Sequence, residues 1–317
     1  MRRRLGLTAL ALLVASCAAG YGWHMTTASM ARNGTSTMQP DLIFGIGDNG
    51  DQVARTARVP VKRSQLSTAL MYDASRIATG AEPVFEFRDA RHRMLLPQAT
   101  DVEFMSDTDE GGGIRTIHVV FKVPVSPTDV HDTAAFEAYD RAMYGYVTGV
   151  LQVIRQAGWK RYIPLSSPRL EGRRTYSFTP DSYAGPTYAT SPSLAQADPD
   201  YALTFEDWRH LSRGGTTLWQ WYADGKFVDL KYERDERSAE LPITLGDQLD
   251  LRIRSEAAWL DTFGPTYEAA RAKYASEVAA LLQQRHAAEV KAQAAGARIL
   301  RDWTDPIIAG VAVPKSR

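Results

Sequence analysis

The chain has 317 residues, of which 44% are hydrophobic, and its 37 basic residues balance 37 acidic ones. This length and composition suffice for one large domain or two modest ones with hydrophobic cores. A balanced charge argues against nucleic acid as a partner, since nucleic acid attracts a basic surface, and it does not favour electrostatic binding to anionic lipid.

The first residues carry the pattern of a secretory signal. A basic segment at residues 2–4 precedes an apolar run at residues 5–15, which only Gly6 and Thr8 interrupt. This run is too short to span a bilayer, so it predicts a signal peptide over residues 1–16 and not a transmembrane helix.

The junction Val14-Ala15-Ser16-Cys17 resembles the lipobox of bacterial lipoproteins, in which the cysteine is lipidated and becomes the first residue after cleavage. Cys17 is the only cysteine, so no internal disulfide can form, and a free structural thiol is the alternative interpretation. The resemblance implies lipid attachment, with acyl chains such as palmitate, at Cys17. Because Ala18 follows where an aspartate usually signals inner-membrane retention, it also implies an outer-membrane lipoprotein that faces the periplasm.

Residues 17–40 are rich in small and polar residues without a sustained period, which predicts a flexible tether. A stripe of Leu66, Leu70 and Met71 predicts a helix over residues 64–77, and short apolar or alternating segments predict strands. The strands are expected at residues 41–46, 83–87, 94–96, 102–105 and 114–123.

The strongest helical pattern covers residues 133–157. Its apolar residues recur at steps of three and four, which is typical of a helix packed on a sheet; they are Phe136, Tyr139, Met143, Val147, Val150, Leu151 and Ile154. Gly158 has the position of a left-handed C-terminal cap. We expect residues 159–163 to re-enter the sheet, residues 164–200 to form a functional loop or to be locally disordered, and residues 205–212 to form a short helix.

Two further strands, residues 216–223 and 226–234, flank Asp224-Gly225, a strong signal for a two-residue hairpin turn. In the resulting register Trp221 faces Val228 and Trp219 faces Leu230, which places bulky apolar residues on one face. The other face is polar but carries the pair Tyr222 and Phe227. This pair is either a stabilising cross-strand contact or an exposed hot spot for a partner.

A half-buried strand is expected around residues 249–253, and residues 265–300 predict one long helix. Its apolar stripe is thin, so this helix is either mostly exposed or docks on something outside the core; Tyr267 and Tyr274 belong to the stripe. The order of elements predicts an α+β fold, in which a long amphipathic helix packs on an antiparallel sheet and a long C-terminal helix is exposed. We expect a single domain at residues 41–303, or two subdomains divided near residues 165–200, and a loose tail at residues 304–317.

No catalytic, cofactor-binding or metal-ligating residues are predicted. The chain lacks the nucleophile elbow of serine hydrolases, the paired histidines of zinc proteases and the phosphate-binding glycine loop, and its six histidines lack ligand spacing. The acidic turn Asp107–Glu110 fails the EF-hand pattern, since Gly111 and His118 stand where that pattern needs acidic groups. A solvated turn is the prediction there, with weak calcium binding as the alternative.

Three segments, Tyr139–Tyr146, Ala157–Pro164 and Leu218–Gly225, are similar to those of proteobacterial lipoproteins associated with type VI secretion. Some of these lipoproteins are immunity proteins for lipase effectors that attack the envelope. The similarity covers residues 124–235 and carries no catalytic motif.

The resemblance implies a periplasmic, membrane-anchored protein that binds and neutralises a secreted antibacterial effector. The partner contacts are then expected in the 164–200 loop, at the hairpin tip or on the C-terminal helix, with Tyr222, Phe227, Tyr267 and Tyr274 as candidate residues. The alternative is an envelope structural lipoprotein or an enzyme whose site the sequence does not reveal.

Overall fold

The computed structural model describes residues 39–75, 83–109, 111–127, 132–177, 194–211, 216–234 and 247–313. Residues 40–317 cluster as one unit by their internal contacts. The predicted signal peptide at residues 1–16, Cys17, the tether up to residue 38, Glu110 and residues 178–193 lie outside the described residues. Within those residues, no helix combines the length and the hydropathy that crossing a membrane requires.

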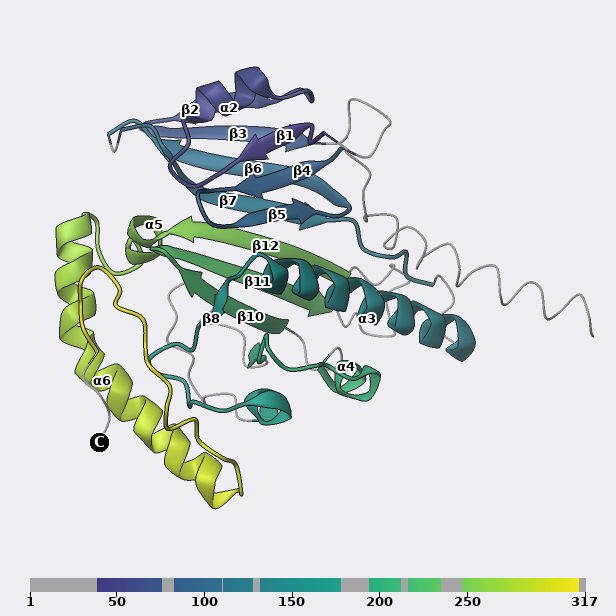
Figure 1. Ribbon diagram of the computed structural model, residues 1–317, viewed down its shortest axis with the longest axis vertical. Coiled ribbons are helices and arrows are strands. Elements are labelled where there is room, and N and C mark those ends of the chain that lie inside the picture. Colours follow the sequence, from purple (N-terminus) through teal and green to yellow (C-terminus); the bar gives the residue numbers. More distant parts are fainter. Residues whose placement is uncertain are drawn as a thin grey trace, which may run out of the picture. The chain divides into compact units, whose positions relative to one another are not determined.

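A nine-stranded sheet runs through the unit (Figure 1). Its strands follow one another in the order β2 (Lys62–Leu66), β3 (Ala69–Ser75), β6 (Ala99–Asp107), β7 (Ile114–Phe121), β12 (Asp247–Ser255), β11 (Lys226–Arg234), β10 (Thr216–Ala223) and β8 (Lys160–Arg161). The last of the nine, β9 (Leu194–Gln196), pairs with β10 in parallel, and the other pairs are antiparallel. The α+β class with a large antiparallel sheet is therefore confirmed.

A smaller sheet consists of β1 (Leu42–Phe44), β4 (Phe85–Arg88) and β5 (Arg93–Leu96). It packs on one face of the large sheet through aromatic rings, since Phe104 of β6 stacks on Phe44 at 6.5 Å and on Tyr72 of β3 at 4.8 Å between ring centroids. The short helix α2 (Gly50–Thr56) follows β1, and Asn49 caps its N-terminus by accepting a hydrogen bond from the backbone of Gln52.

The helix α3 (Thr133–Gln156) covers the same face over β10, β11 and β12 (Figure 1). Its buried side chains include Met143, Val147 and Ile154, which belong to one cluster with the apolar residues of the three strands. Each such side chain contributes about 1.5–3 kcal/mol by leaving water. The predicted amphipathic helix is confirmed to within one residue, and Gly158 has the expected left-handed φ of 84°.

The predicted hairpin is confirmed in its turn and its register, since Trp221 pairs with Val228 and Trp219 with Leu230. The strands predicted before and after the hairpin are present with shifted ends, and α4 (Phe205–Leu211) agrees with the predicted short helix as far as the described residues reach.

The predicted helix at residues 64–77 is wrong, because β2 and β3 form a hairpin there. Leu70, Tyr72 and Ala74 are buried while Met71 is exposed, an alternation of period two. The turn between the strands carries no glycine; Ser67 adopts the left-handed φ of 55° instead.

The opposite face of the large sheet is covered at one end by α5 (Glu256–Leu260) and α6 (Tyr267–Ala294). Phe227 is only 1% exposed there, because Trp259 stacks on its ring at 4.5 Å and Tyr162 meets it edge-on at 5.2 Å. The alternation alone predicts that the second face of the hairpin is polar. In the structure, part of this face is buried around Phe227.

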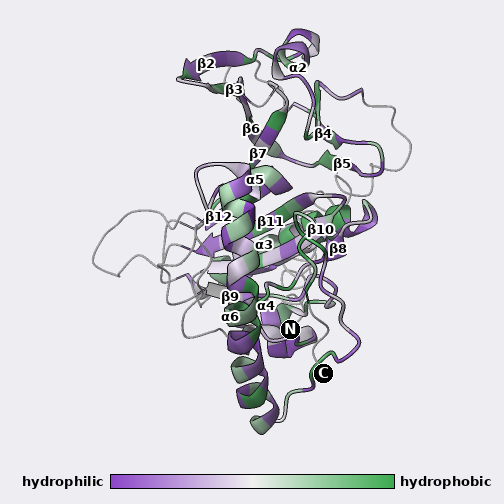
Figure 2. Cartoon of the chain, turned by 90° about the vertical axis from the view of Figure 1, so that its left-hand side faces the viewer, coloured by the Kyte–Doolittle hydropathy of each residue, from purple (hydrophilic) through white to green (hydrophobic). Residues whose placement is uncertain are grey.

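The helix predicted at residues 265–300 is shorter in the structure and ends at Ala294. Gly296 takes a left-handed φ of 82°, and the amides of Gly296 and Ala297 return to the carbonyls of Gln293 and Ala292. Hydrophilic and hydrophobic residues are mixed along α6 (Figure 2), which is why its apolar stripe is thin.

Candidate partner-binding surface

Two of the candidate partner contacts, Tyr267 and Tyr274, lie on the helix α6. The contacts between α6 and the rest of the fold therefore decide which of its side chains are exposed. Its N-terminal half is fixed by aromatic packing. Tyr274 is 1% exposed and meets Trp259 at 5.5 Å and Phe263 at 5.3 Å between ring centroids. Ala270 and Val278 are buried in the same cluster.

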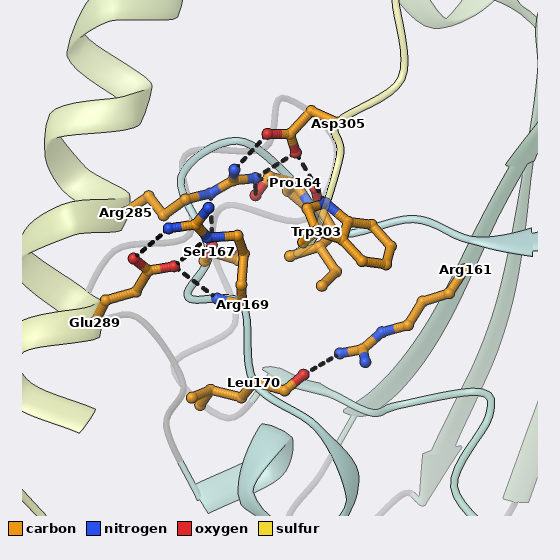
Figure 3. Close-up of polar contacts among 10 residues, drawn as sticks. Arg161, Pro164, Ser167, Arg169, Leu170, Arg285, Glu289, Trp303 and Asp305 are labelled. Carbon is orange, nitrogen blue, oxygen red and sulfur yellow. Dashed lines mark hydrogen bonds and ion pairs between the residues drawn. The ribbon is translucent and has the colours of Figure 1, made fainter. Parts of the chain in front are cut away.

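Its C-terminal half is fixed by charges instead, and Arg285 is the centre of this network (Figure 3). The Arg285 guanidinium donates to both carboxylate oxygens of Asp305, at 2.6 and 2.9 Å, and so binds the chain that follows α6. It also donates to the backbone carbonyls of Ser167, Pro164 and Ile163 at 3.0–3.3 Å. Arg285 is 3% exposed, so these bonds replace the water that the buried charge has lost.

One turn further along α6, Glu289 binds Arg169 in a two-point ion pair. Arg169 Nε donates to Glu289 Oε1 at 2.7 Å and Nη2 donates to Oε2 at 2.9 Å, while the Arg169 amide also donates to Oε1. Burial alone would raise the pKa of the Glu289 carboxyl, but these hydrogen bonds and the nearby charges lower it below 4.5.

The loop that receives α6 is held to the sheet by Arg161 of β8. Its Nη2 donates to the Leu170 carbonyl at 2.7 Å, and its Nη1 lies 3.0 Å from Asp198 Oδ2 (Figure 3 shows the Leu170 bond). Residues 163–170 are thus fixed between β8 and α6. This part of the predicted 164–200 loop is ordered by defined contacts, whereas residues 178–193 lie outside the described residues.

Of the four candidate contact residues, only Tyr267 presents a large part of its surface, with 38% exposed. Phe227 and Tyr274 are buried, so neither ring lies on the surface of this fold. Tyr222 is half-buried, and its hydroxyl hydrogen-bonds Glu256 Oε2 at 3.0 Å and the Ile307 carbonyl at 3.2 Å. The pair Tyr222 and Phe227 is thus a packing contact, with 4.8 Å between ring centroids.

The hairpin tip is not free either. Asp224 Oδ1 accepts a hydrogen bond from Arg91 at 2.8 Å, and Lys226 pairs with Asp89 at 3.1 Å. The tip is therefore docked on the turn between β4 and β5.

Other polar clusters are satisfied by their neighbours. The buried Asp247 carboxylate accepts hydrogen bonds from Tyr139, at 2.6 Å, from Tyr232 and from Arg234. The Asp107 carboxylate accepts hydrogen bonds from the Asp109 amide in its own turn and from the Thr68 hydroxyl in the neighbouring β2–β3 turn. In the part of the chain that the structure describes, no group of three His, Cys, Asp or Glu residues gathers to hold a metal ion.

The sequence did not reveal the contacts that Arg169, Arg285 and Glu289 make. The contacts of Arg285 and Glu289 with residues 163–169 join positions 118–122 residues apart along the chain, so no local pattern predicts them. For Arg285 and Glu289, the available signal was that the apolar stripe of the predicted C-terminal helix is thin.

In comparisons with protein-family models, curated proteins and solved structures, nothing matches the chain.

Proposed function

We propose that this chain is a lipid-anchored envelope protein that binds a secreted antibacterial effector, such as a type VI lipase, and neutralises it. The observation that carries the proposal is the lipobox-like junction Val14–Cys17, which would hold the folded part where such an effector acts. The similarity of residues 124–235 to lipoproteins associated with type VI secretion, some of which are immunity proteins, supports the same function.

The geometry of α6 is compatible with a binding role. A helix fixed at both halves loses little conformational freedom when a partner docks on it, and this preorganisation favours affinity. The side of α6 that faces away from the packed clusters is exposed along its length in the described residues, from Tyr267 to Val290, which is 52% exposed.

The test is protection of living cells. Bacteria that direct a lipase effector to their own periplasm are made to produce the full chain, and survival is compared with cells that lack it. We expect survival to rise. We also expect the purified chain to inhibit that lipase by forming a complex of about one chain per lipase molecule. No protection against any effector of a panel of envelope lipases, together with no binding to them, would contradict the proposal.

A further inference from the structure

The strand β2 forms one edge of the large sheet and, among the described residues, pairs with β3 alone (Figure 1). All five of its residues are exposed, and Leu66 is exposed to 71%. The opposite edge is divided between β8, with two residues, and β9, with three. Sheets often protect their edges by such short strands, because an unpaired strand offers its backbone to another chain. The edge at β2 is longer than either of them.

The strand β2 also lacks other features that protect a sheet edge. It contains no proline, and its pairing with β3 runs in one register without a bulge. Its charges, Lys62 and Arg63, stand at its start, and Arg63 Nε donates to Asp51 Oδ1 at 3.0 Å. The second half of the strand, Ser64 to Leu66, carries no charge. This half is therefore open to pairing with another strand.

The turn after β2 decides which of its backbone groups point outward. Residues 67 and 68 form a two-residue turn, so the flanking pair Leu66 and Ala69 is hydrogen-bonded. Because bonded and non-bonded pairs alternate along an antiparallel ladder, every second residue before Leu66 is also bonded to β3. Arg63 and Gln65 are the residues in between. Their amide and carbonyl groups therefore point away from β3, out of the edge.

A second copy of β2 meets these groups in an antiparallel register centred on Ser64. Arg63 of each copy then lies opposite Gln65 of the other, and each of these pairs exchanges two backbone hydrogen bonds. Lys62 of each copy lies opposite the exposed Leu66 of the other, whose side chain its methylene groups cover. No two cations lie directly opposite each other, so the repulsion of like charges is avoided. The edge is thus complementary to itself, as a two-fold interface requires.

The helix α2 leaves room for this second copy. Its first residue, Gly50, packs against the ring of Tyr72, which belongs to β3, one strand inward from the edge. The Tyr72 hydroxyl donates to Asp51 at 2.8 Å and so holds the helix there. Arg63 and Gln65 point to the same face and remain exposed. The helix therefore does not cover β2.

We propose that two copies of this chain associate through their β2 edges, which joins the two large sheets into one. The interface contains one strand pair and is small, so we expect a weak dimer. This inference goes beyond the proposed function, and it depends neither on the effector nor on the lipid anchor.

Cysteine cross-linking tests the register. The full chain carries Cys17→Ala, so that each introduced cysteine is the only one. In the proposed register, residue 64 lies opposite its own counterpart in a non-hydrogen-bonded pair, whose Cα separation of about 4.5 Å suits a disulfide. The two copies of residue 62 lie about 14 Å apart, because four residues of strand separate them. We expect Ser64→Cys to form a disulfide-linked dimer under mild oxidation and Lys62→Cys, which is also at an exposed position, to form none.

Sedimentation of the Cys17→Ala chain measures the association without an added cysteine. Gln65→Pro removes an outward amide at an edge, where strands tolerate proline. It should weaken the dimer at least about tenfold, which is about 1.4 kcal/mol. Gln65→Ala is the matched control, because it removes the same side chain but keeps the amide, and it should leave the association unchanged. Urea denaturation checks that both variants are folded.

Three results would each overturn the proposal. They are the absence of a cross-link in Ser64→Cys, equal cross-linking in Ser64→Cys and Lys62→Cys, and an association that a folded Gln65→Pro leaves unchanged. If Gln65→Pro does not fold, the comparison of the two cysteine variants decides. A chain that sediments as a monomer and forms no cross-link leaves β2 as an edge without a second copy.

Discussion

Arg285 connects three parts of the chain through one buried guanidinium, and its removal tests whether the network holds α6. Arg285→Met would remove the Arg285 hydrogen bonds from the Asp305 carboxylate and from the carbonyls of residues 163, 164 and 167. We expect a loss of about 3–5 kcal/mol in the free energy of unfolding, as for other buried ion pairs that lose one partner. Urea denaturation measures this loss.

Arg55→Met is the control for that substitution, because Arg55 is exposed on α2. Its cost should stay within about 0.5 kcal/mol. Equal effects of the two substitutions would show that Arg285 stabilises the fold no more than a surface residue does.

Glu289 gives the network a dependence on pH. Burial would raise the pKa of its carboxyl, but the hydrogen bonds from Arg169 lower it below 4.5. Since the folded state has the lower pKa, the contribution of Glu289 to stability is present above about pH 4.5 and is lost as the pH falls below that value. Glu289→Gln should therefore be most destabilising at neutral pH, with a difference from the parent that shrinks in acid.

Stability measured from pH 7 down to pH 3 tests this expectation. Glu277→Gln serves as the control, because the Glu277 side chain on the same helix is 40% exposed and only 3.9 Å from the exposed Lys273, and it should differ little from the parent throughout. A difference between Glu289→Gln and the parent that is constant with pH would contradict the role assigned to the ion pair.

At the scale of the element, Tyr274 marks the buried side of α6 and Tyr267 marks its exposed side. The sequence placed both on one thin stripe, but Tyr274 is 1% exposed and Tyr267 is 38% exposed. Tyr274→Ala should cost about 3–5 kcal/mol, because it removes a ring from the aromatic cluster. Tyr267→Ala should cost about 0.5 kcal/mol and serves as the matched control. Thermal unfolding of the two variants tests the orientation of the helix, which equal losses would contradict.

Local signals explain which elements were predictable. The β10–β11 hairpin was found because its Asp224-Gly225 turn and its alternation lie within one short stretch. The β2–β3 hairpin was taken for a helix because three apolar residues in its strands also fit a helical stripe, and its turn at Ser67 lacks the usual glycine. The candidate site was less predictable, since the burial of Phe227 depends on Trp259 and Tyr162, which no spacing connects to it.

At the scale of the whole molecule, the order of strands and helices was enough to predict the α+β class, while the proposed lipid anchoring rests on a single residue, Cys17. If Cys17 carries the lipid, Cys17→Ala should abolish incorporation of labelled palmitate and move the chain out of the outer-membrane fraction. Folding of the domain should be unaffected. Fractionation together with palmitate labelling measures both effects; unchanged labelling of the variant would exclude Cys17 as the lipid site.

The attachment of α6 has a consequence for how the protein is made. A chain emerges from its N-terminus, so every strand of the large sheet exists before the helix that covers its second face. Until Tyr274 and Arg285 arrive, Phe227 and Tyr162 lack the cover that α6 provides, and the carbonyls of residues 163, 164 and 167 lack the hydrogen bonds from Arg285. During synthesis the protein therefore passes through a stage in which these aromatic side chains are exposed and prone to aggregation. The last fifty residues of the chain then cover them.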